Sequence, residues 1–447
     1  MAPLDTLLEG GVVVTCDAQD RVVRGDVLVR DGRIAAIGRG PARSALRCPT
    51  RLLDARGCAV APGFVQAHVH LCQTLMRGMA DDMPLLEWLR GRIWPLEAAH
   101  DERSSAASAE LGLLEAMTAG TTTLLDMGSV RAHDAVMEAC VRAGVRALSG
   151  KAMMDCGEGV PAGLRESTRA SLDESERMAR TWRGRGEGRI GYAWAPRFVL
   201  SCSEALVRGA VERARLEGDL VHTHAAEHPE EREAVRRALG DDDVAVLRSW
   251  GVAGPNAVLA HGVQLRDDEA LSLARDGTRV VHCPSANLKL GSGIARVADL
   301  DRMGVSLALG ADGAPCNNNL DPWTELRHAA LLAKVRSGVQ ALPARRALRL
   351  ATIDGARALG LDAETGSIEV GKKADLMVVR LDGPHAEPWG DVHARLVYAC
   401  GARDVRHVLV DGVLVVRDGA HQLLDPERVT AVARSEARRL WKRAGLA

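Results

Sequence analysis

The stretch Pro62-Gly63-Phe64-Val65-Gln66-Ala67-His68-Val69-His70 carries the strongest structural signal in this sequence. It predicts a strand that ends on two histidines at positions i and i+2. Side chains alternate across a strand, so His68 and His70 point the same way and can reach one metal ion. A lone His-x-His pair is often coincidental, and the remaining ligands have to come from elsewhere in the chain.

Three further short apolar runs end in His224, His261 and Asp312, respectively. Helix-like segments lie between such runs, and strand–helix alternation implies a parallel sheet. A (β/α)₈ barrel carries its active site at the C-terminal ends of its strands. Three imidazoles and one carboxylate, with a water at the open position, make the ligand set of a catalytic divalent ion. The pattern therefore predicts a metal site inside a barrel.

Both ends of the chain contain an Asp-Gly pair between apolar runs, at Asp31-Gly32 and at Asp411-Gly412. This pattern is a strong β-hairpin signal. Isolated hairpins are marginal in water, so we expect both ends to pair in one small β-sandwich domain. The 447 residues exceed the roughly 250 of a plain barrel, which leaves room for that domain. We predict an α/β protein in which residues 61–365 form a TIM barrel, while residues 1–60 and 366–447 form the sandwich and a C-terminal helix.

The composition limits the partners of the protein. The formal net charge is −1, from 58 basic and 59 acidic residues, which argues against nucleic acid as a polymeric partner. No run approaches the ~18 apolar residues needed to span a bilayer, and the N-terminus lacks the pattern of a signal peptide. Ten scattered cysteines fit free thiols in a reducing cytosol. We expect a cytoplasmic protein that binds no membrane, and a homo-oligomer, either a dimer or a tetramer.

The motifs resemble the amidohydrolase superfamily, and within it the branch of S-adenosylhomocysteine, methylthioadenosine and 5′-deoxyadenosine deaminases. Besides Pro-Gly-Phe-x-x-x-His-x-His, the shared motifs are His224-Ala225-Ala226-Glu227, Ala260-His261-Gly262, Cys283-Pro284-Ser285-Ala286-Asn287-Leu288-Lys289-Leu290 and Asp312-Gly313. Guanine deaminases and triazine hydrolases are neighbouring branches. The resemblance implies that one divalent ion is bound by His68, His70, His224 and Asp312. Zn²⁺ suits this set, and Fe²⁺ and Mn²⁺ are alternatives.

The resemblance also implies roles for residues in hydrolytic deamination of a small aminopurine. Asp312 would take a proton from the attacking water, and Glu227 would protonate the ring nitrogen beside the leaving amine. His261 would hydrogen-bond the water. Trp88 would form an apolar wall against the base, and Glu97 matches a position that holds ribose hydroxyls.

Arg197 departs from the nucleoside branch, which has a histidine at this place in the motif. The run Pro196-Arg197-Phe198 resembles guanine deaminases, where the arginine helps to hold the purine, and Gln73 also resembles that group. A guanidinium offers fixed donors to a carbonyl or a ring nitrogen. We expect a deaminase of an adenine nucleoside. The alternatives are a guanine or oxopurine deaminase and an s-triazine amino- or chlorohydrolase.

Two further hypotheses concern the metal site. Lys151 follows Ser149-Gly150 in a short apolar run, and a carbamylated lysine there would bridge two metal ions. The deaminase branch works with one metal ion and needs no such bridge. The second hypothesis is a non-enzymatic assembly protein of the dihydropyrimidinase-like type. Such proteins tend to lose metal ligands, whereas all four are present in this chain.

Overall fold

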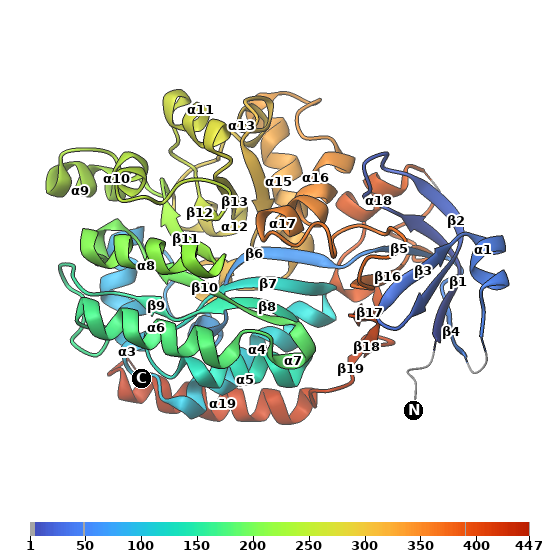
Figure 1. Ribbon diagram of the computed structural model, residues 1–447, viewed down its shortest axis with the longest axis horizontal. Coiled ribbons are helices and arrows are strands. Elements are labelled where there is room, and N and C mark those ends of the chain that lie inside the picture. Colours follow the sequence, from blue (N-terminus) through green and yellow to red (C-terminus); the bar gives the residue numbers. More distant parts are fainter. Residues whose placement is uncertain (1–4, 48–49, 389, 447) are drawn as a thin grey trace.

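Eight parallel strands form a barrel from the middle of the chain (Figure 1). The computed structural model describes residues 5–47, 50–388 and 390–446. The barrel strands are β6 (Phe64–His70), β7 (Thr121–Met127), β8 (Arg146–Gly150), β10 (Ile190–Pro196), β11 (Leu220–Ala225), β12 (Ala257–His261), β13 (Arg279–His282) and β14 (Ser306–Leu309). Each strand pairs in parallel with the next one along the chain. The predicted barrel is confirmed.

The barrel closes where its last strand meets its first. β15 (Asp312–Gly313) comes shortly after β14 and pairs in parallel with β6, where Asp312 lies opposite Val69. Gly310 permits this close passage, because a Cβ at that position would lie 2.6 Å from the carbonyl oxygen of His68. Closure therefore brings Asp312 beside the histidines of β6.

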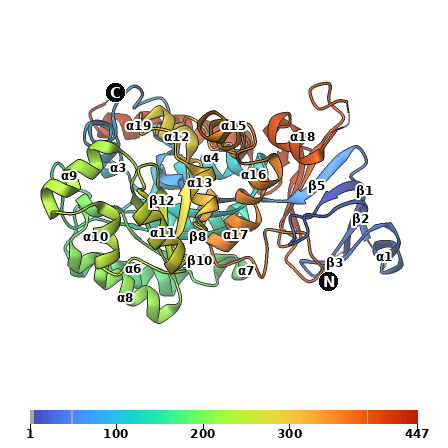
Figure 2. The same cartoon turned by 90° about the horizontal axis from the view of Figure 1, so that it is seen from above.

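Helices cover the outside of the barrel (Figure 2). Side-chain caps begin several of them; Asp101, for example, accepts a hydrogen bond from the Ser104 backbone nitrogen at 2.8 Å. The longer helices are α4 (Glu102–Thr118), α5 (His133–Ala143), α6 (Thr168–Trp182), α8 (Glu204–Glu217), α9 (Pro229–Leu239), α10 (Asp243–Ser249), α11 (Asp267–Asp276), α15 (Pro322–Ser337), α16 (Ala344–Leu350) and α19 (Pro426–Arg443). Shorter elements near the active site are η1 (Leu71–Met76), α2 (Leu85–Trp88), η2 (Leu89–Ile93), α3 (Trp94–Ala98), β9 (Ala152–Met153), α12 (Pro284–Lys289) and α14 (Ala314–Asn317). The other short helices are α1 (Arg39–Ser44), α7 (Arg185–Gly188), α13 (Val297–Arg302), α17 (Ile353–Ala358) and α18 (Val392–Tyr398).

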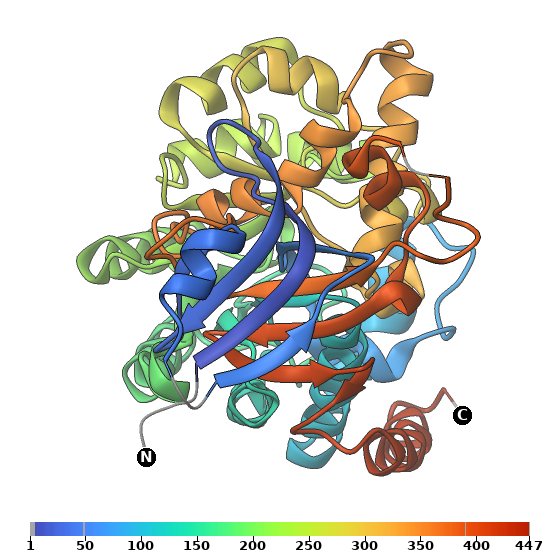
Figure 3. The same cartoon turned by 90° about the vertical axis from the view of Figure 1, so that its right-hand side faces the viewer.

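Strands from both ends of the chain form a second sheet beside the barrel (Figure 3). Its members are β1 (Asp5–Val14), β2 (Val22–Arg30), β3 (Arg33–Ile37), β4 (Thr50–Asp54), β5 (Cys58–Pro62), β16 (Leu376–Arg380), β17 (Val405–Val410), β18 (Val413–Arg417) and β19 (Ala420–His421). β5 joins the two halves, because it pairs in parallel with β1 and antiparallel with β16. Hydrogen bonding is continuous through one mixed sheet of nine strands. The predicted pairing of the two termini is confirmed.

The two predicted hairpin turns touch each other in this sheet. Gly32 and Gly412 both have a φ of 75°, a left-handed conformation that suits glycine. A Cβ on Gly32 would lie 2.8 Å from the carbonyl oxygen of Asp411. The Asp-Gly pairs therefore form the turns and also allow the turns to pack together.

The terminal sheet lies against the N-terminal ends of the barrel strands. Arg146, the first residue of β8, binds Asp375 through two hydrogen bonds of 2.7 and 3.1 Å. Asp375 also accepts from the Asp411 backbone nitrogen at 2.6 Å. Both side chains of the Arg146–Asp375 pair are buried. The sheet thus occupies the end of the barrel opposite to the C-terminal strand ends.

The C-terminal helix α19 packs along the barrel helix α4, as Figure 1 shows. Trp441 donates its ring N–H to the carbonyl oxygen of Leu75 at 2.9 Å, and Arg443 donates to that of Ala99 at 2.8 Å. The helix thus packs on the barrel, although it follows the terminal strands in the chain, and the domain boundaries near residues 60 and 365 stay a prediction. In the described part of the chain, no helix is long and apolar enough to cross a membrane.

Candidate metal centre and active site

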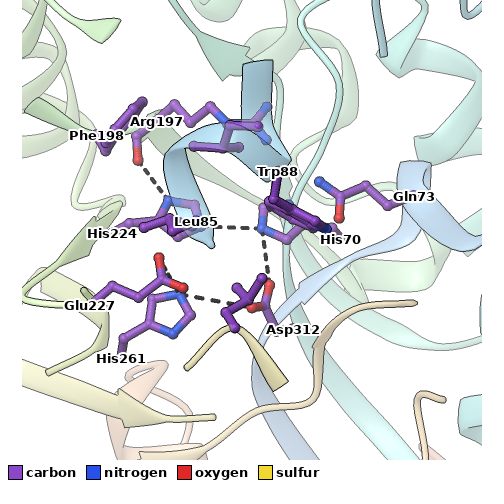
Figure 4. Close-up of a pocket in the computed structure, with 12 residues that line it drawn as sticks. His70, Gln73, Leu85, Trp88, Arg197, Phe198, His224, Glu227, His261 and Asp312 are labelled. Carbon is purple, nitrogen blue, oxygen red and sulfur yellow. Dashed lines mark hydrogen bonds and ion pairs between the residues drawn. The ribbon is translucent and has the colours of Figure 1, made fainter. Parts of the chain in front are cut away.

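Polar residues predicted from the strand ends meet at one point inside the barrel, and Figure 4 shows His70, His224 and Asp312 of this set. His68 and His70 come from β6, His224 from β11, and Asp312 from β15. The Asp312 Oδ1 lies 3.2 Å from His68 Nε2 and 3.3 Å from His70 Nε2. His70 Nε2 lies 3.2 Å from His224 Nε2. These atoms form one compact set of nitrogen and oxygen donors.

The spacing of these donor atoms fits a small divalent ion. Four ligands at about 2.0–2.1 Å in a tetrahedron lie roughly 3.3 Å from each other. Among the described residues, one ligand atom each of His68, His224, His261 and Asp312 also lies within 4.8 Å of the others. The protein therefore has a metal site of three histidines and one aspartate.

Hydrogen bonds at Nδ1 orient three of the imidazoles. The Nδ1 of His70 lies 2.8 Å from the carbonyl oxygen of Met127, and that of His224 lies 2.7 Å from the carbonyl oxygen of Arg197. A carbonyl oxygen only accepts, so each Nδ1 donates and each Nε2 keeps its lone pair. His68 Nδ1 contacts His222 Nε2 at 2.8 Å, and in the described chain its buried Nε2 lacks a hydrogen-bond partner. Such outer hydrogen bonds are typical of metal-binding histidines.

Burial keeps these histidines uncharged. It lowers the pKa of His68, His70 and His261 well below the usual value. Burial by itself would raise the pKa of Asp312, but the neighbouring His261, His70 and His224 outweigh it and lower that pKa. Neutral imidazoles and an ionised carboxylate are the forms that bind a cation.

His261 makes different contacts from the other histidines. The Asn287 Nδ2 lies 2.9 Å from its Nδ1 and donates to it, so the ring hydrogen is on Nε2. That Nε2 lies 3.5 Å from Glu227 Oε2 and 3.9 Å from Asp312 Oδ2. His261 and Asp312 have φ values of 79° and 63°, which are rare for residues other than glycine and cluster at functional sites. The strained backbone changes the direction of both side chains at the ends of their strands.

Glu227 reaches the same cavity from the loop after β11 (Figure 4). Its backbone nitrogen donates to Glu231 Oε2 at 3.3 Å. Burial raises the pKa of Glu227 well above its usual value, and the carboxyl groups of Glu231 and Asp312 raise it further. A carboxyl group in these surroundings keeps its proton and can act as an acid.

The cavity above the metal site is small and mostly apolar on its outer side. Its volume is about 30 Å³. Trp88 and Leu85 from α2, together with Phe198, cover it. The predicted residues Gln73 and Arg197 also line it, whereas Glu97 is absent from the described lining residues.

Glu97 is instead bonded to two of the lining residues. Its Oε1 accepts from Gln73 Nε2 at 2.8 Å and from Arg197 Nη2 at 3.1 Å, and its Oε2 pairs with Arg197 Nη1. All three side chains are buried. The substrate contacts predicted for Gln73, Trp88, Glu97 and Arg197 stay predictions, and the structure brings three of these residues into one network.

Lys151 has a partner outside the metal site. Its Nζ lies 2.5 Å from Glu166 Oε2 and 3.3 Å from Ser171 Oγ. An amine engaged in this way is a poor candidate for a bridging carbamate.

Two residues around the metal site were missed in the sequence. His222, the partner of His68, stands in a second His-x-His run, His222-Thr223-His224, which was a usable signal. Asn287, the partner of His261, lies in one of the family motifs but had no predicted role. Neither contact follows from spacing, because the partners are 154 and 26 residues apart.

Comparisons with known proteins agree with this geometry. The sequence profile of the Amidohydrolase family matches residues 59–415. The chain is 40% identical, over 99% of both chains, to a 5-methylthioadenosine/S-adenosylhomocysteine deaminase of Halobacterium salinarum. It is 36% identical, over 98% of this chain and 99% of the relative, to a 5′-deoxyadenosine deaminase of Methanosarcina acetivorans. A crystal structure of an adenosine deaminase from Xanthomonas campestris with bound zinc superposes with a TM-score of 0.92 at 33% identity, over 99% of both chains. The protein therefore belongs to the amidohydrolase family.

Proposed function

We propose that this protein is a metal-dependent hydrolytic deaminase of an adenine nucleoside of the 5′-deoxyadenosine, methylthioadenosine or S-adenosylhomocysteine type. The observation that carries the proposal is the meeting of a three-histidine, one-aspartate site with the buried acid Glu227 in one cavity. The full-length relatives with these activities support the choice of substrate. Ammonia is the expected product.

We propose that one divalent ion is held by His68, His70, His224 and Asp312. The free Nε2 atoms of the histidines and the Asp312 carboxylate support this set, and the hydrogen on His261 Nε2 argues for a different role for that residue. Zn²⁺ fits three nitrogens and one oxygen, and the zinc in the related adenosine deaminase supports it. Fe²⁺ and Mn²⁺ are the alternatives that metal analysis tests.

The proposed reaction divides the proton transfers between two carboxyl groups. When bound, a divalent ion at this site lowers the pKa of a water toward about 7, so that the water can attack the carbon bearing the amine. Asp312 accepts the proton of the water and passes it to the amine, which leaves as ammonia. Glu227 donates its proton to the ring nitrogen beside that carbon and regains a proton from the added hydroxyl group as the carbonyl of the product forms. His261, through its Nε2–H, orients the attacking oxygen.

A panel of substrates tests this proposal. Ammonia release is measured with 5′-deoxyadenosine, methylthioadenosine, S-adenosylhomocysteine, adenosine, guanine and 8-oxoguanine, and release of chloride or alkylamine is measured with atrazine. The proposal expects the highest kcat/KM for one of the adenine nucleosides. A protein of native metal content that releases ammonia from none of them would refute the nucleoside assignment.

One observation favours a second candidate, a guanine or oxopurine deaminase. The carboxylate of Glu97 is occupied by Arg197 and Gln73, so the position expected to hold ribose is engaged within the protein. The remaining N–H groups of Arg197 suit a carbonyl oxygen on a base. A preference for guanine or 8-oxoguanine in the same panel would select this candidate. Turnover of atrazine alone would select the s-triazine alternative.

We also propose that the protein is a homo-oligomer. Val335, near the end of α15, and Val339, just after it, are each 80% exposed. Contiguous exposed apolar patches often mark an interface, and the proposal is that these two side chains belong to one. Light scattering should give the mass of a dimer or a tetramer, and a monomer at micromolar concentration would contradict the proposal.

A further inference from the structure

Glu97 accepts three hydrogen bonds from its own protein. Its side chain, on α3, is 0% exposed. Gln73 donates to its Oε1, and the guanidinium of Arg197 binds both of its oxygens. Because Glu97 is buried behind these partners and is absent from the described lining of the cavity, a substrate hydroxyl would reach this carboxylate only if a neighbouring side chain moved. Displacing Arg197 would leave a buried cation without its counter-charge, which is strongly unfavourable.

The network fixes the direction of the Gln73 amide. Because Nε2 is bound to Glu97, the oxygen Oε1 is turned away from it and lies over Gly313, where a Cβ would come within 2.0 Å. Gly313 directly follows Asp312, so Oε1 lies close to the metal site. Oε1 is buried and has no hydrogen-bond partner in the described residues. Buried acceptors are normally satisfied, and an N–H or O–H of a bound molecule would satisfy this one.

Arg197 is held both by its side chain and by its backbone. Glu97 binds two nitrogens of the guanidinium, while the carbonyl oxygen of Arg197 accepts from His224 Nδ1 at 2.7 Å. A guanidinium has five N–H donors, so donors remain for an acceptor atom in the cavity. Arg197 therefore connects the cavity wall with a residue of the metal site.

We propose that Glu97 is a positioning residue, which fixes Gln73 and Arg197 so that they recognise a substrate presenting a hydrogen-bond donor to Gln73 and an acceptor to Arg197. In this role Glu97 supports the contact residues and does not touch the substrate. That differs from the direct contact with ribose hydroxyls that the family resemblance implies. The inference rests on the proposed deaminase function, because it names what the same cavity recognises.

The decisive test compares two substrates that differ in their ribose hydroxyls. The variant Glu97→Gln is assayed with adenosine and with 2′,3′-dideoxyadenosine, which differ only in the 2′- and 3′-hydroxyls. We expect KM to rise and kcat/KM to fall by the same factor for both substrates, roughly 10- to 100-fold, as for loss of hydrogen bonds to a charged group. A large loss with adenosine and almost none with the dideoxy compound would show direct ribose contact and overturn the proposal.

Two controls separate positioning from general damage. Glu87 is exposed on the neighbouring α2, so Glu87→Gln should leave kcat/KM unchanged. Metal content should be the same in Glu97→Gln as in the wild type. The double variant Glu97→Gln with Arg197→Met should lose less kcat/KM than the two single losses combined, because part of the effect of Glu97 passes through Arg197 and the rest through Gln73. Fully additive losses would contradict the proposal.

The anchoring itself is measured without turnover. Thermal unfolding of Glu97→Gln, Arg197→Met and the double variant forms a cycle that reports the coupling of the two side chains. We expect the double variant to be clearly more stable than the sum of the single effects predicts. Absence of coupling would overturn the inference. Failure of the wild type to deaminate any adenine nucleoside would instead refute the proposed function and leave this result intact.

Discussion

The floor and the roof of the active-site cavity are built in different ways. The floor consists of His68, His70, His224 and Asp312, which lie at the ends of hydrogen-bonded strands. The roof comes from α2 and η2, a short helical segment whose second part is a π-helix. π-helical turns are rare and are frequent at functional sites. The rigid floor fixes the chemistry, whereas the roof controls what can reach it.

The cavity beneath the roof is much smaller than the cavity behind it. The cavity beneath the roof has a volume of about 30 Å³. A second cavity of about 710 Å³ lies against the other side of the segment, where it is lined by Leu86, Arg90 and Trp94. Lys289 forms an ion pair with Asp81, which precedes the segment. We therefore expect the roof to move outward when substrate binds.

Substitutions of floor residues should cause the largest losses of metal and of activity. His70→Ala and Asp312→Asn should each lose the metal ion, and activity should fall by more than the roughly 10²–10⁴-fold of a lost general acid. Metal analysis measures the loss of the ion, and ammonia release measures the loss of activity. The exposed His385 provides the matched control, and His385→Ala should keep both metal and activity. Unchanged metal content in His70→Ala would contradict its place among the ligands.

Glu227, between floor and roof, should give the next largest effect. Glu227→Gln keeps the shape of the side chain but removes its acidic proton, so kcat should fall about 10²–10⁴-fold while the metal stays bound. Steady-state kinetics on metal-replete protein measure this. Glu230 lies three residues away and is exposed, so Glu230→Gln should leave kcat unchanged. If Glu227→Gln turns over normally, its role as the acid is wrong.

Substitution of His222, which contacts His68 in the floor, should have a moderate effect on metal affinity. His222→Leu removes the partner of His68 Nδ1, and loss of such an outer hydrogen bond typically lowers metal affinity about 10- to 100-fold. Competition with a chelating dye measures the affinity. His222→Gln restores an acceptor and should recover part of the loss. Equal affinities in wild type and His222→Leu would mean that the contact does not orient the ligand.

A substitution that loosens the roof should have the smallest effect on kcat/KM, and it should raise kcat/KM, whereas the other substitutions lower activity or metal affinity. Asp81→Asn removes a partly exposed ion pair, which is worth at most about 1 kcal/mol. Easier opening should raise kcat/KM by up to roughly fivefold, with metal content unchanged. Stopped-flow binding and steady-state kinetics test this, with the exposed neighbour Asp82→Asn as control. A fall in kcat/KM would show that the pair does not restrain opening.

The contrast between floor and roof also explains which parts of the site were predictable. Period-two alternation places His68 and His70 on one side of a strand, and a parallel barrel brings strand ends to one end. These two rules predicted a site of three histidines and one aspartate at the strand ends, and the described residues contain a cluster of that composition. Which of the histidines bind the ion stays a prediction. The roof follows no such rule, since Trp88 ends the short helix α2, whereas Phe198 lies in the loop after β10, far away in the sequence.

The sequence by itself determined the barrel, the pairing of the two termini and the meeting of three histidines and one aspartate at the strand ends. These features follow from local patterns: alternation along β6, strand–helix succession, and Asp-Gly turns such as Asp31-Gly32. Only the tertiary structure decided which buried groups become partners. Glu97 and Arg197 are 100 residues apart, and no local pattern encodes their contact. Their pairing exists because closure of the barrel buries both charges in one place, where each is stable only beside the other.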